Sequence, residues 1–385
     1  MGDYFKCPIC GNDDENKLGI KNGQLYCRAC ISFKGQPAIK NNCVVGQSSF
    51  SINYSLTDEQ KRISDAVLLN FMNGKDTLID AVCGAGKTEL VFQVIDYALN
   101  SGLKVGFTVP RREVVIEIAE RFKNVFHKNR IITVYGGNTD FLDGEIICLT
   151  THQLYRYRNY FDLIIFDEID AFPYDQNSVL ESFFNNSYKG NCVILSATPP
   201  EKLLELYKQK NKSILSLNTR YHGHLLPVPK IIILPHFLSI LYLIHLLRKY
   251  TKSKMKVFVF VPTIDKCEKL HKFLLLFFHR VKCVHSKKKD KEKIISEFKK
   301  GEHDLLITTS LLERGVTFSN LQVVVMDSCN KIFQTKTLIQ ISGRVGRKKD
   351  HPTGEVIFIG KRKSKEMENS VETIRRKNLD LQNMF

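Results

Sequence analysis

The segment AVCGAGKTEL, residues 81–90, contains the residue types of a phosphate-binding loop. It fits the pattern A-x4-G-K-T, in which backbone N–H groups and the start of a helix surround phosphate oxygens. Lys87 would reach the β- and γ-phosphate oxygens, and Thr88 would ligate Mg²⁺. The strict pattern has glycine at the first position. The segment therefore predicts a nucleotide site formed by Ala81, Val82, Cys83, Gly84, Ala85, Gly86, Lys87 and Thr88.

A second chemical motif, LIIFDEID, ends an apolar run at Asp167 and Glu168. The carboxyl end of a parallel strand is where α/β sheets bind their ligands. Asp167 would hold Mg²⁺ through water, and Glu168 would polarise the attacking water. Acidic residues after a strand often only begin a loop, but the upstream phosphate loop favours the catalytic interpretation. In the later segment LSATPP, the Ser196-Ala197-Thr198 turn is a candidate for sensing the γ-phosphate and coupling it to the rest of the chain.

The segment QISGRVGR, residues 340–347, places Arg344 and Arg347 three positions apart. In a helix, side chains at this spacing share one face. From the residues alone, that face could be a solvated surface or part of an active site.

Four cysteines near the N-terminus have the spacing C-x2-C, 16 residues, C-x2-C: Cys7, Cys10, Cys27 and Cys30. This spacing is typical of a four-thiolate Zn²⁺ site. A disulfide pair or redox chemistry is the alternative, and the missing secretory signal disfavours it. The metal is interpreted as structural, because a segment of about 45 residues scarcely holds a core without one. A secondary contact with DNA through its basic residues is the other interpretation.

Composition predicts an ordinary folded protein of more than one domain. The chain has 385 residues, of which 43% are hydrophobic and 25% charged. Residues 1–229 contain 25 Lys+Arg and 25 Asp+Glu, whereas residues 230–385 contain 32 and 15. The net charge of +17 therefore belongs to the second half and indicates a polyanionic partner. The most apolar stretch, residues 231–247, is short for a membrane span and is interpreted as a buried strand followed by a helix. Because the N-terminus also lacks a secretory signal, an intracellular protein is expected.

Short β-branched runs alternate with amphipathic helices in two series, one on each side of residues 220–230. Such alternation predicts parallel sheets flanked by helices. The predicted fold class is α/β, with two tandem domains after a small zinc-binding module. The expected boundaries are 1–48 for the module and connector, 49–225 for the first domain, and 226–385 for the basic second domain with a helical tail.

The motifs appear in an order that resembles superfamily 2 helicases and translocases over about residues 55–365. This resemblance implies two RecA-like domains that sandwich ATP, with Gln340, Arg344 and Arg347 supplied by the second domain. The arginines would neutralise charge on the transferring phosphoryl group. Gln60 would read adenine, and Gly315 would be another nucleotide contact. Phe50 or Tyr54 could stack on the nucleotide or pack in the core.

The same resemblance implies contacts with the nucleic-acid backbone, which give affinity without sequence specificity. The first domain would contribute Pro110, Arg111, Arg112, Thr150 and Thr151. The second would contribute Thr263, Thr308 and Thr309.

The segments DEIDAFPY, RYHGHLLPVP and LLERGVTF, together with the N-terminal cysteines, resemble the ComFA family of competence ATPases. The resemblance implies a DNA-dependent ATPase that uses ATP, Mg²⁺ and Zn²⁺. It also implies a cytoplasmic motor at the inner face of the membrane that draws single-stranded DNA through an uptake channel, with competence proteins as partners and with self-association. The alternatives are a replication-restart or repair DNA helicase, and a nucleic-acid-binding module that has lost hydrolysis. The intact motif residues oppose the last.

Overall fold

The computed structural model describes residues 6–40, 47–175, 177–313 and 318–382. The chain divides into two compact units. Unit 1 contains residues 1–81 and 86–217, and unit 2 contains residues 82–85 and 218–385. The predicted contact of Gly315 with nucleotide lies outside the described residues.

The N-terminal module of unit 1 is a small hairpin framed by two turns that carry the cysteines. A 3-10 turn, η1 (Glu15–Lys17), leads into two antiparallel strands, β1 (Leu18–Lys21) and β2 (Gln24–Cys27). Gly23 adopts a left-handed φ of 76° at the hairpin turn, a conformation that glycine reaches without strain. Cys27 thus ends a strand, while the other three cysteines lie in turns.

A seven-stranded parallel sheet forms the centre of unit 1, in the order β5-β6-β4-β7-β8-β3-β9. Six of the strands overlap short β-branched runs of the sequence, and β9 adds an edge strand that the pattern did not indicate. Most of the central strand residues are buried on both faces, as a sheet covered by helices requires. The strands are β3 (Thr77–Ala81), β4 (Val105–Val109), β5 (Ile131–Val134), β6 (Ile146–Thr150), β7 (Phe161–Asp167), β8 (Tyr188–Ser196) and β9 (Ser213–Leu217).

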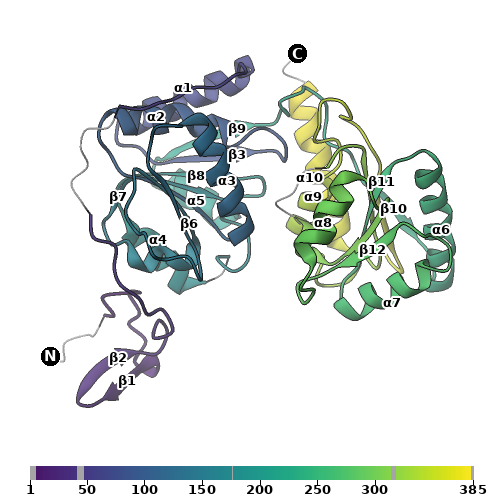
Figure 1. Ribbon diagram of the computed structural model, residues 1–385, viewed down its shortest axis with the longest axis horizontal. Coiled ribbons are helices and arrows are strands. Elements are labelled where there is room, and N and C mark those ends of the chain that lie inside the picture. The colour runs from purple at the N-terminus through teal and green to yellow at the C-terminus, as the bar shows by residue number, and fades with distance from the viewer. Residues whose placement is uncertain (1–5, 41–46, 176, 314–317, 383–385) are drawn as a thin grey trace. The chain divides into compact units, whose positions relative to one another are not determined.

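Helices cover both faces of this sheet (Figure 1). The apolar faces of α1, α2 and α3 are buried, and α4 packs with Tyr207 of α5 into a separate cluster that includes the four cysteines. The helices are α1 (Asp58–Met72), α2 (Phe92–Asn100), α3 (Arg112–Val125), α4 (Ser178–Ser187) and α5 (Glu201–Gln209). Two 3-10 turns, η2 (Glu89–Val91) and η3 (Thr151–Arg156), follow β3 and β6.

Unit 2 has a six-stranded parallel sheet in the order β10-β15-β14-β11-β13-β12. The strands are β10 (Lys230–Ile233), β11 (Lys256–Phe260), β12 (Val281–Val284), β13 (Leu305–Thr308), β14 (Leu321–Val325) and β15 (Val356–Gly360). The expectation of a buried strand at the start of residues 231–247 is wrong. That strand, β10, lies at the sheet edge and pairs only with β15, which leaves its residues exposed or half-buried.

The helices of unit 2 form two separate cores on the two sheet faces. Helices α6 and α7 pack on one face, and α8, α9 and α10 on the other (Figure 1). They span α6 (His236–Lys252), α7 (Ile264–Leu274), α8 (Lys291–Lys300), α9 (Thr335–Ser342) and α10 (Lys365–Gln382), with a 3-10 turn η4 (Ser310–Glu313) after β13. Within the described part of the chain, none of the helices is both long and apolar enough to cross a bilayer.

Candidate functional site

Three predicted nucleotide motifs follow three neighbouring strands of the sheet in unit 1. The phosphate loop follows β3, the DEID segment ends β7, and the SAT segment ends β8 between them. Because these strands are parallel, their carboxyl ends meet at one edge of the sheet, where α/β proteins bind ligands. The sheet topology therefore brings together motifs that are about 30 to 110 positions apart in the chain.

The phosphate loop has the left-handed glycines that such a loop needs. Gly84 and Gly86 have φ of 85° and 78°, and the Ala85 N–H donates to the carbonyl of Val82 at 3.1 Å. The expected helix directly after Lys87 begins later. A 3-10 turn comes first, and α2 starts only at Phe92, as is common at helix N-termini.

Gln60 lies beside this loop and already has a structural partner. Its side-chain oxygen accepts from the Thr57 N–H at 3.0 Å, and Thr57 accepts from the Gln60 N–H at 3.2 Å, which forms a capping box at the start of α1. A Cβ at Gly86 would lie 2.6 Å from the Gln60 amide nitrogen. Gln60 therefore joins the start of α1 to the phosphate loop. Phe50, in contrast, packs against Phe126 with ring centroids 5.7 Å apart.

Arg121, on α3, contacts the nucleotide motif and was missed in the sequence. Its guanidinium donates to the Thr88 hydroxyl at 3.3 Å and forms an ion pair with Glu89. Thr88 is 5% exposed. To ligate a metal ion, the Thr88 oxygen must keep a lone pair directed away from Arg121. No local pattern marks this arginine, because its partner lies 33 positions earlier.

Asp167 has the environment of a metal ligand. Its side chain is 9% exposed, and its Oδ1 is buried with no hydrogen-bond partner among the described residues. Burial raises the pKa of Asp167 to about 6, Lys87 opposes this shift, and the charges of Glu168 and Asp170 add to it. A buried carboxylate oxygen without a donor fits Mg²⁺, which prefers oxygen ligands. Glu168 follows in a left-handed conformation, with φ of 62°, which is uncommon outside glycine.

The last residue of DEID, Asp170, connects this motif to the SAT turn. Ser196 donates to Asp170 Oδ1 at 2.8 Å, and Thr198 donates to Oδ2 at 2.7 Å. The Thr198 N–H also donates to the Ser196 hydroxyl at 3.1 Å. Both hydroxyls that the sequence offered as phosphate sensors are thus bound to one carboxylate that is 1% exposed.

The predicted DNA contacts of unit 1 lie together at the ends of two neighbouring strands. Val109, just before Pro110, pairs with Thr150 across β4 and β6. Arg112 is exposed and lies over the Tyr135 ring at 4.9 Å, whereas Thr150 and Thr151 are 7% and 0% exposed. Arg112 is therefore accessible and Arg111 half-buried, while the two threonines are buried.

The predicted DNA contacts of unit 2 occupy the equivalent edge of the second sheet. Thr263 is exposed and caps α7 by accepting from the Lys266 N–H at 3.2 Å. Thr308 ends β13, beside Phe260 of β11, and its buried hydroxyl donates to the Thr309 carbonyl at 3.1 Å. Of the three predicted threonines, Thr263 is exposed, Thr309 is half-buried and Thr308 is buried.

The expectation that Arg344 and Arg347 share a helical face is wrong. Helix α9 contains Gln340 but ends at Ser342, and both arginines lie in the turns beyond it. Gly346 has a left-handed φ of 67°, and a Cβ there would lie 2.2 Å from the Pro352 carbonyl oxygen, so this turn requires glycine. Arg344 is 1% exposed, and the half-buried Arg347 donates to the Gly343 carbonyl at 2.8 Å.

Arg220, in the connector segment RYHGH, is a buried cation close to these turns of unit 2. It is 2% exposed and donates to the Gly346 carbonyl at 2.7 Å, which His222 also contacts at 2.9 Å. Its Nε and Nη2 atoms are buried with no hydrogen-bond partner among the described residues. Burial lowers the pKa of Arg220 to about 10, and the charge of Arg347 adds to this shift. The sequence interpretation missed this arginine.

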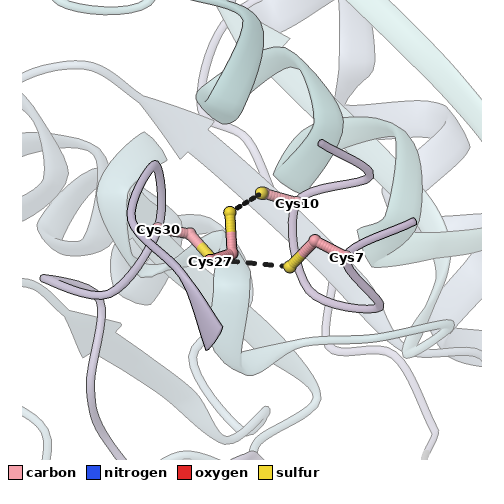
Figure 2. A group of neighbouring side chains, drawn as sticks. All are labelled: Cys7, Cys10, Cys27 and Cys30. Carbon is pink, nitrogen blue, oxygen red and sulfur yellow. Dashed lines mark hydrogen bonds between the residues drawn. The ribbon is translucent and has the colours of Figure 1, made fainter. Parts of the chain in front are cut away.

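The four N-terminal cysteines converge as their spacing predicts (Figure 2). Their sulfurs lie within 4.8 Å of one another, with Cys7 to Cys30 at 3.7 Å and Cys10 to Cys27 at 3.6 Å. A tetrahedral ion with Zn–S bonds of about 2.3 Å separates its sulfurs by about 3.8 Å. All four are buried free thiols, so their arrangement fits zinc and not a pair of disulfides.

This cysteine module packs on η3, which begins at Thr151, and on α4. The Phe33 ring meets Phe183 of α4 edge-on at 4.9 Å. From η3, Tyr155 donates to the Lys34 carbonyl at 2.9 Å, and Arg156 donates to the Gln36 carbonyl at 2.7 Å. The cysteine-bearing turns and a predicted DNA-contacting turn are therefore parts of one packed region of unit 1.

Two protein families match the two halves of the chain. Residues 53–201 match the family described as Type III restriction enzyme, res subunit, and residues 239–349 match Helicase conserved C-terminal domain. The competence protein ComFA of Bacillus subtilis is 32% identical, over 97% of this chain and 86% of that protein. ComFA of Streptococcus pneumoniae is also 32% identical, over 91% of this chain and 85% of that protein. The DNA helicase RecG of Aquifex aeolicus is 25% identical, but this chain covers only 40% of it.

Solved structures share the fold at low sequence identity. S. cerevisiae Dbp5 bound to RNA and ADP BeF3 has a TM-score of 0.60 at 17% identity, over 85% of this chain and 92% of that one. RecG bound to a three-way DNA junction has a TM-score of 0.59 at 18% identity, over 86% of this chain and 49% of that one. The predicted fold class, two tandem RecA-like domains after a small cysteine module, is confirmed.

Proposed function

The chain belongs to the ComFA family of competence proteins and is a DNA-dependent ATPase of the superfamily 2 class, and we propose that it translocates single-stranded DNA during natural transformation. The observation that carries this proposal is the 32% identity to ComFA over 97% of the chain. RecG, a DNA helicase, is less similar, and the match covers under half of its length. DNA import is therefore favoured over a role in repair or replication restart.

In the proposed reaction, the residues of unit 1 bind ATP and prepare the attacking water. The phosphate loop surrounds the phosphates with backbone N–H groups, and Lys87 contacts their oxygens. Thr88 and Asp167 would hold Mg²⁺, which when bound would neutralise phosphate charge. Glu168 accepts a hydrogen bond from the water and orients it toward the γ-phosphorus. The buried Oδ1 of Asp167 supports this assignment, because only a cation or a donor satisfies it.

Arg344 and Arg347 of unit 2 are proposed to stabilise charge that develops on the transferring phosphoryl group. Arginines in this role accelerate other nucleotide hydrolases by about 10³ to 10⁵. Gln340 would assist in orienting the same groups, and Asp170 would carry the state of the nucleotide to Ser196 and Thr198.

Single-stranded DNA is the proposed substrate track, and its backbone phosphates are the proposed contacts. Arg112 of unit 1 and Thr263 of unit 2 are exposed, and Arg111 and Thr309 are half-buried. The excess of Lys and Arg in residues 230–385 supports a polyanionic partner. The four cysteines are proposed to hold Zn²⁺, and the motor is proposed to act at the inner face of the membrane with an uptake channel and other competence proteins.

The test is ATP hydrolysis by the full chain with single-stranded DNA, duplex DNA and RNA compared at one salt concentration. Single-stranded DNA should stimulate hydrolysis most, and stimulation should fall as salt rises. Equal stimulation by RNA, or none by DNA, would overturn the proposed substrate.

Two variants test the assigned residues. Lys87→Ala and Arg347→Ala should abolish hydrolysis and still bind DNA, whereas the exposed Lys269→Ala serves as a control with unchanged rates. In cells, Lys87→Ala should abolish transformation. Turnover by either variant would remove that residue from the mechanism, and normal transformation by Lys87→Ala would refute the import role.

A further inference from the structure

A second cluster of metal-binding side chain types lies in unit 2, far along the chain from the four cysteines. Glu268 and His271 are three positions apart on α7, so they share one helical face. Cys283 lies in β12, and His285 directly follows the strand. Because they are two positions apart, their side chains point to the same side of the strand. Helix α7 packs against β12, which brings the two pairs together.

Three of these side chains have the mutual spacing of ligands on one ion. One oxygen of Glu268, one ring nitrogen of His271 and the sulfur of Cys283 all lie within 4.8 Å of one another. The sulfur of Cys283 is 3.6 Å from Glu268 Oε2. A tetrahedral zinc ion with bonds of about 2.0 to 2.3 Å separates such atoms by about 3.3 to 3.8 Å. The distance between the Cys283 sulfur and Glu268 Oε2 is already in this range, and the other two distances are at most 4.8 Å.

The surrounding hydrogen bonds leave the ligand atoms available. His285 Nε2 lies 2.8 Å from Glu268 Oε1, and Lys288 approaches the same oxygen at 3.4 Å. Both contacts use Oε1, so Oε2 stays directed at the sulfur of Cys283. His271 Nε2 lies 3.4 Å from the Val281 carbonyl oxygen, and a proton on Nε2 leaves the Nδ1 lone pair for a metal. Such outer hydrogen bonds orient the ligands of many metal sites.

We propose that Glu268, His271 and Cys283 form a second divalent transition-metal site, of the zinc class, separate from the four-cysteine site. Thiolate, imidazole and carboxylate together are a ligand set that zinc accepts, whereas magnesium and calcium do not bind thiolate. Cys283 is 2% exposed, and the side chain of Glu268 is 36% exposed. The sulfur thus lies at the buried end of the cluster, and an ion enters from the half-exposed helix side.

The site would fix α7 to β12 close in the chain to a predicted DNA contact. Thr263, the N-cap residue of α7, is the exposed residue among the predicted DNA contacts in unit 2. A metal bond between the helix and the strand restrains the helix without adding a residue to the ATP site. ATP hydrolysis does not require the ion, so this proposal can fail while the proposed function stands.

The test is the number of Zn²⁺ ions bound by the full chain after reconstitution, measured by elemental analysis. The intact chain should bind two, and Cys283→Ser should bind one. Cys329→Ser, a half-buried cysteine of the same unit, is the matched control and should keep both. Cys7→Ser combined with Cys10→Ser should leave one ion, and adding Cys283→Ser should remove it.

A second, half-exposed ligand guards against loss of folding in the buried-cysteine variant. His271→Gln should also lose one ion, while the exposed His279→Gln should keep both. Co²⁺ substituted at the second site of the Cys7→Ser, Cys10→Ser protein should give a thiolate charge-transfer band that Cys283→Ser abolishes. A single bound ion in the intact chain, or two ions in folded Cys283→Ser and His271→Gln proteins, would overturn the proposal.

Discussion

The contact between Asp170 and the SAT turn offers a quantitative test of how unit 1 is held together. The Asp170 carboxylate accepts from Ser196 at 2.8 Å and from Thr198 at 2.7 Å, in a region where Asp170 and Ser196 are 1% and 0% exposed. Thr198→Val removes one of these donors with little change in volume. Thr108→Val is its matched control, because the Thr108 hydroxyl is also buried in unit 1 but has no hydrogen-bond partner among the described residues.

The two valine variants should differ clearly in the free energy of unfolding. A hydrogen bond to a charged group contributes about 1.5 to 3 kcal/mol, so Thr198→Val should destabilise unit 1 by about that amount. Thr108→Val loses no hydrogen bond and should be neutral or slightly stabilising. Asp170→Ala removes both acceptors and should destabilise by about 3 to 6 kcal/mol. Asp170→Asn keeps one amide oxygen as acceptor and should lie between these limits.

The assay is urea unfolding followed by a double-mutant cycle of Asp170→Asn with Thr198→Val. Residues in direct contact typically show interaction energies of about 0.5 to 3 kcal/mol. The same variants should keep basal ATP hydrolysis but respond less to single-stranded DNA, since the link between DEID and SAT is weakened. An interaction energy near zero, or equal effects of Thr198→Val and Thr108→Val, would refute the assigned hydrogen bonds.

Three other predictions concern charge, burial and the cysteine module. Because burial raises the pKa of Asp167 to about 6, Mg²⁺-dependent nucleotide binding should strengthen as pH rises through about 6 and Asp167 loses its proton. Glu168→Gln removes a charge that raises this pKa, so it should move the midpoint of this pH dependence to lower pH. A midpoint near 4 in the intact chain would contradict this. Asp143→Ala leaves the Lys104 ammonium, whose side chain is 1% exposed, without this carboxylate, and should lower the free energy of unfolding in urea by about 3 to 5 kcal/mol. Asp265→Ala breaks an ion pair with Lys269 whose side chains are 68% and 75% exposed, and should lower it by under about 0.5 kcal/mol. Equal costs would show that burial does not set the difference. Phe33→Ala should release zinc several-fold faster to a chelator than Phe33→Leu does, because it removes the ring that packs on α4; equal rates would exclude this packing as a restraint.

The sequence predicted the local chemistry well because each motif is a short segment. A phosphate loop, an acidic strand end and paired CxxC turns depend on residues that are close in the chain. The strand pattern was also readable, since parallel strands buried on both faces are continuous apolar runs. β9 was the difficult strand, because its apolar residues are interrupted by Ser216 and it is only partly buried, whereas the apolar run of β10 predicted a strand but not its exposed place at the sheet edge.

Several details of the site depended on contacts that the sequence does not display. Asp170 was passed over because its two partners lie 26 and 28 positions later in the chain. Arg220 was passed over because its partner, Gly346, lies 126 positions away. Helix periodicity placed Arg344 and Arg347 on one face, but the left-handed Gly346 belongs to a turn.

The sequence by itself determined the fold class, the family resemblance, the four-cysteine cluster and the three motifs that follow neighbouring strands of unit 1. These follow from residue type, local spacing and the burial pattern of single elements. Only the tertiary structure decided which carboxylate holds the SAT hydroxyls, that Thr151 is buried while Arg112 is exposed, and that α7 and β12 form a second cluster of metal-binding side chains. The physical reason is that burial and long-range pairing arise when elements pack, and no local pattern encodes them.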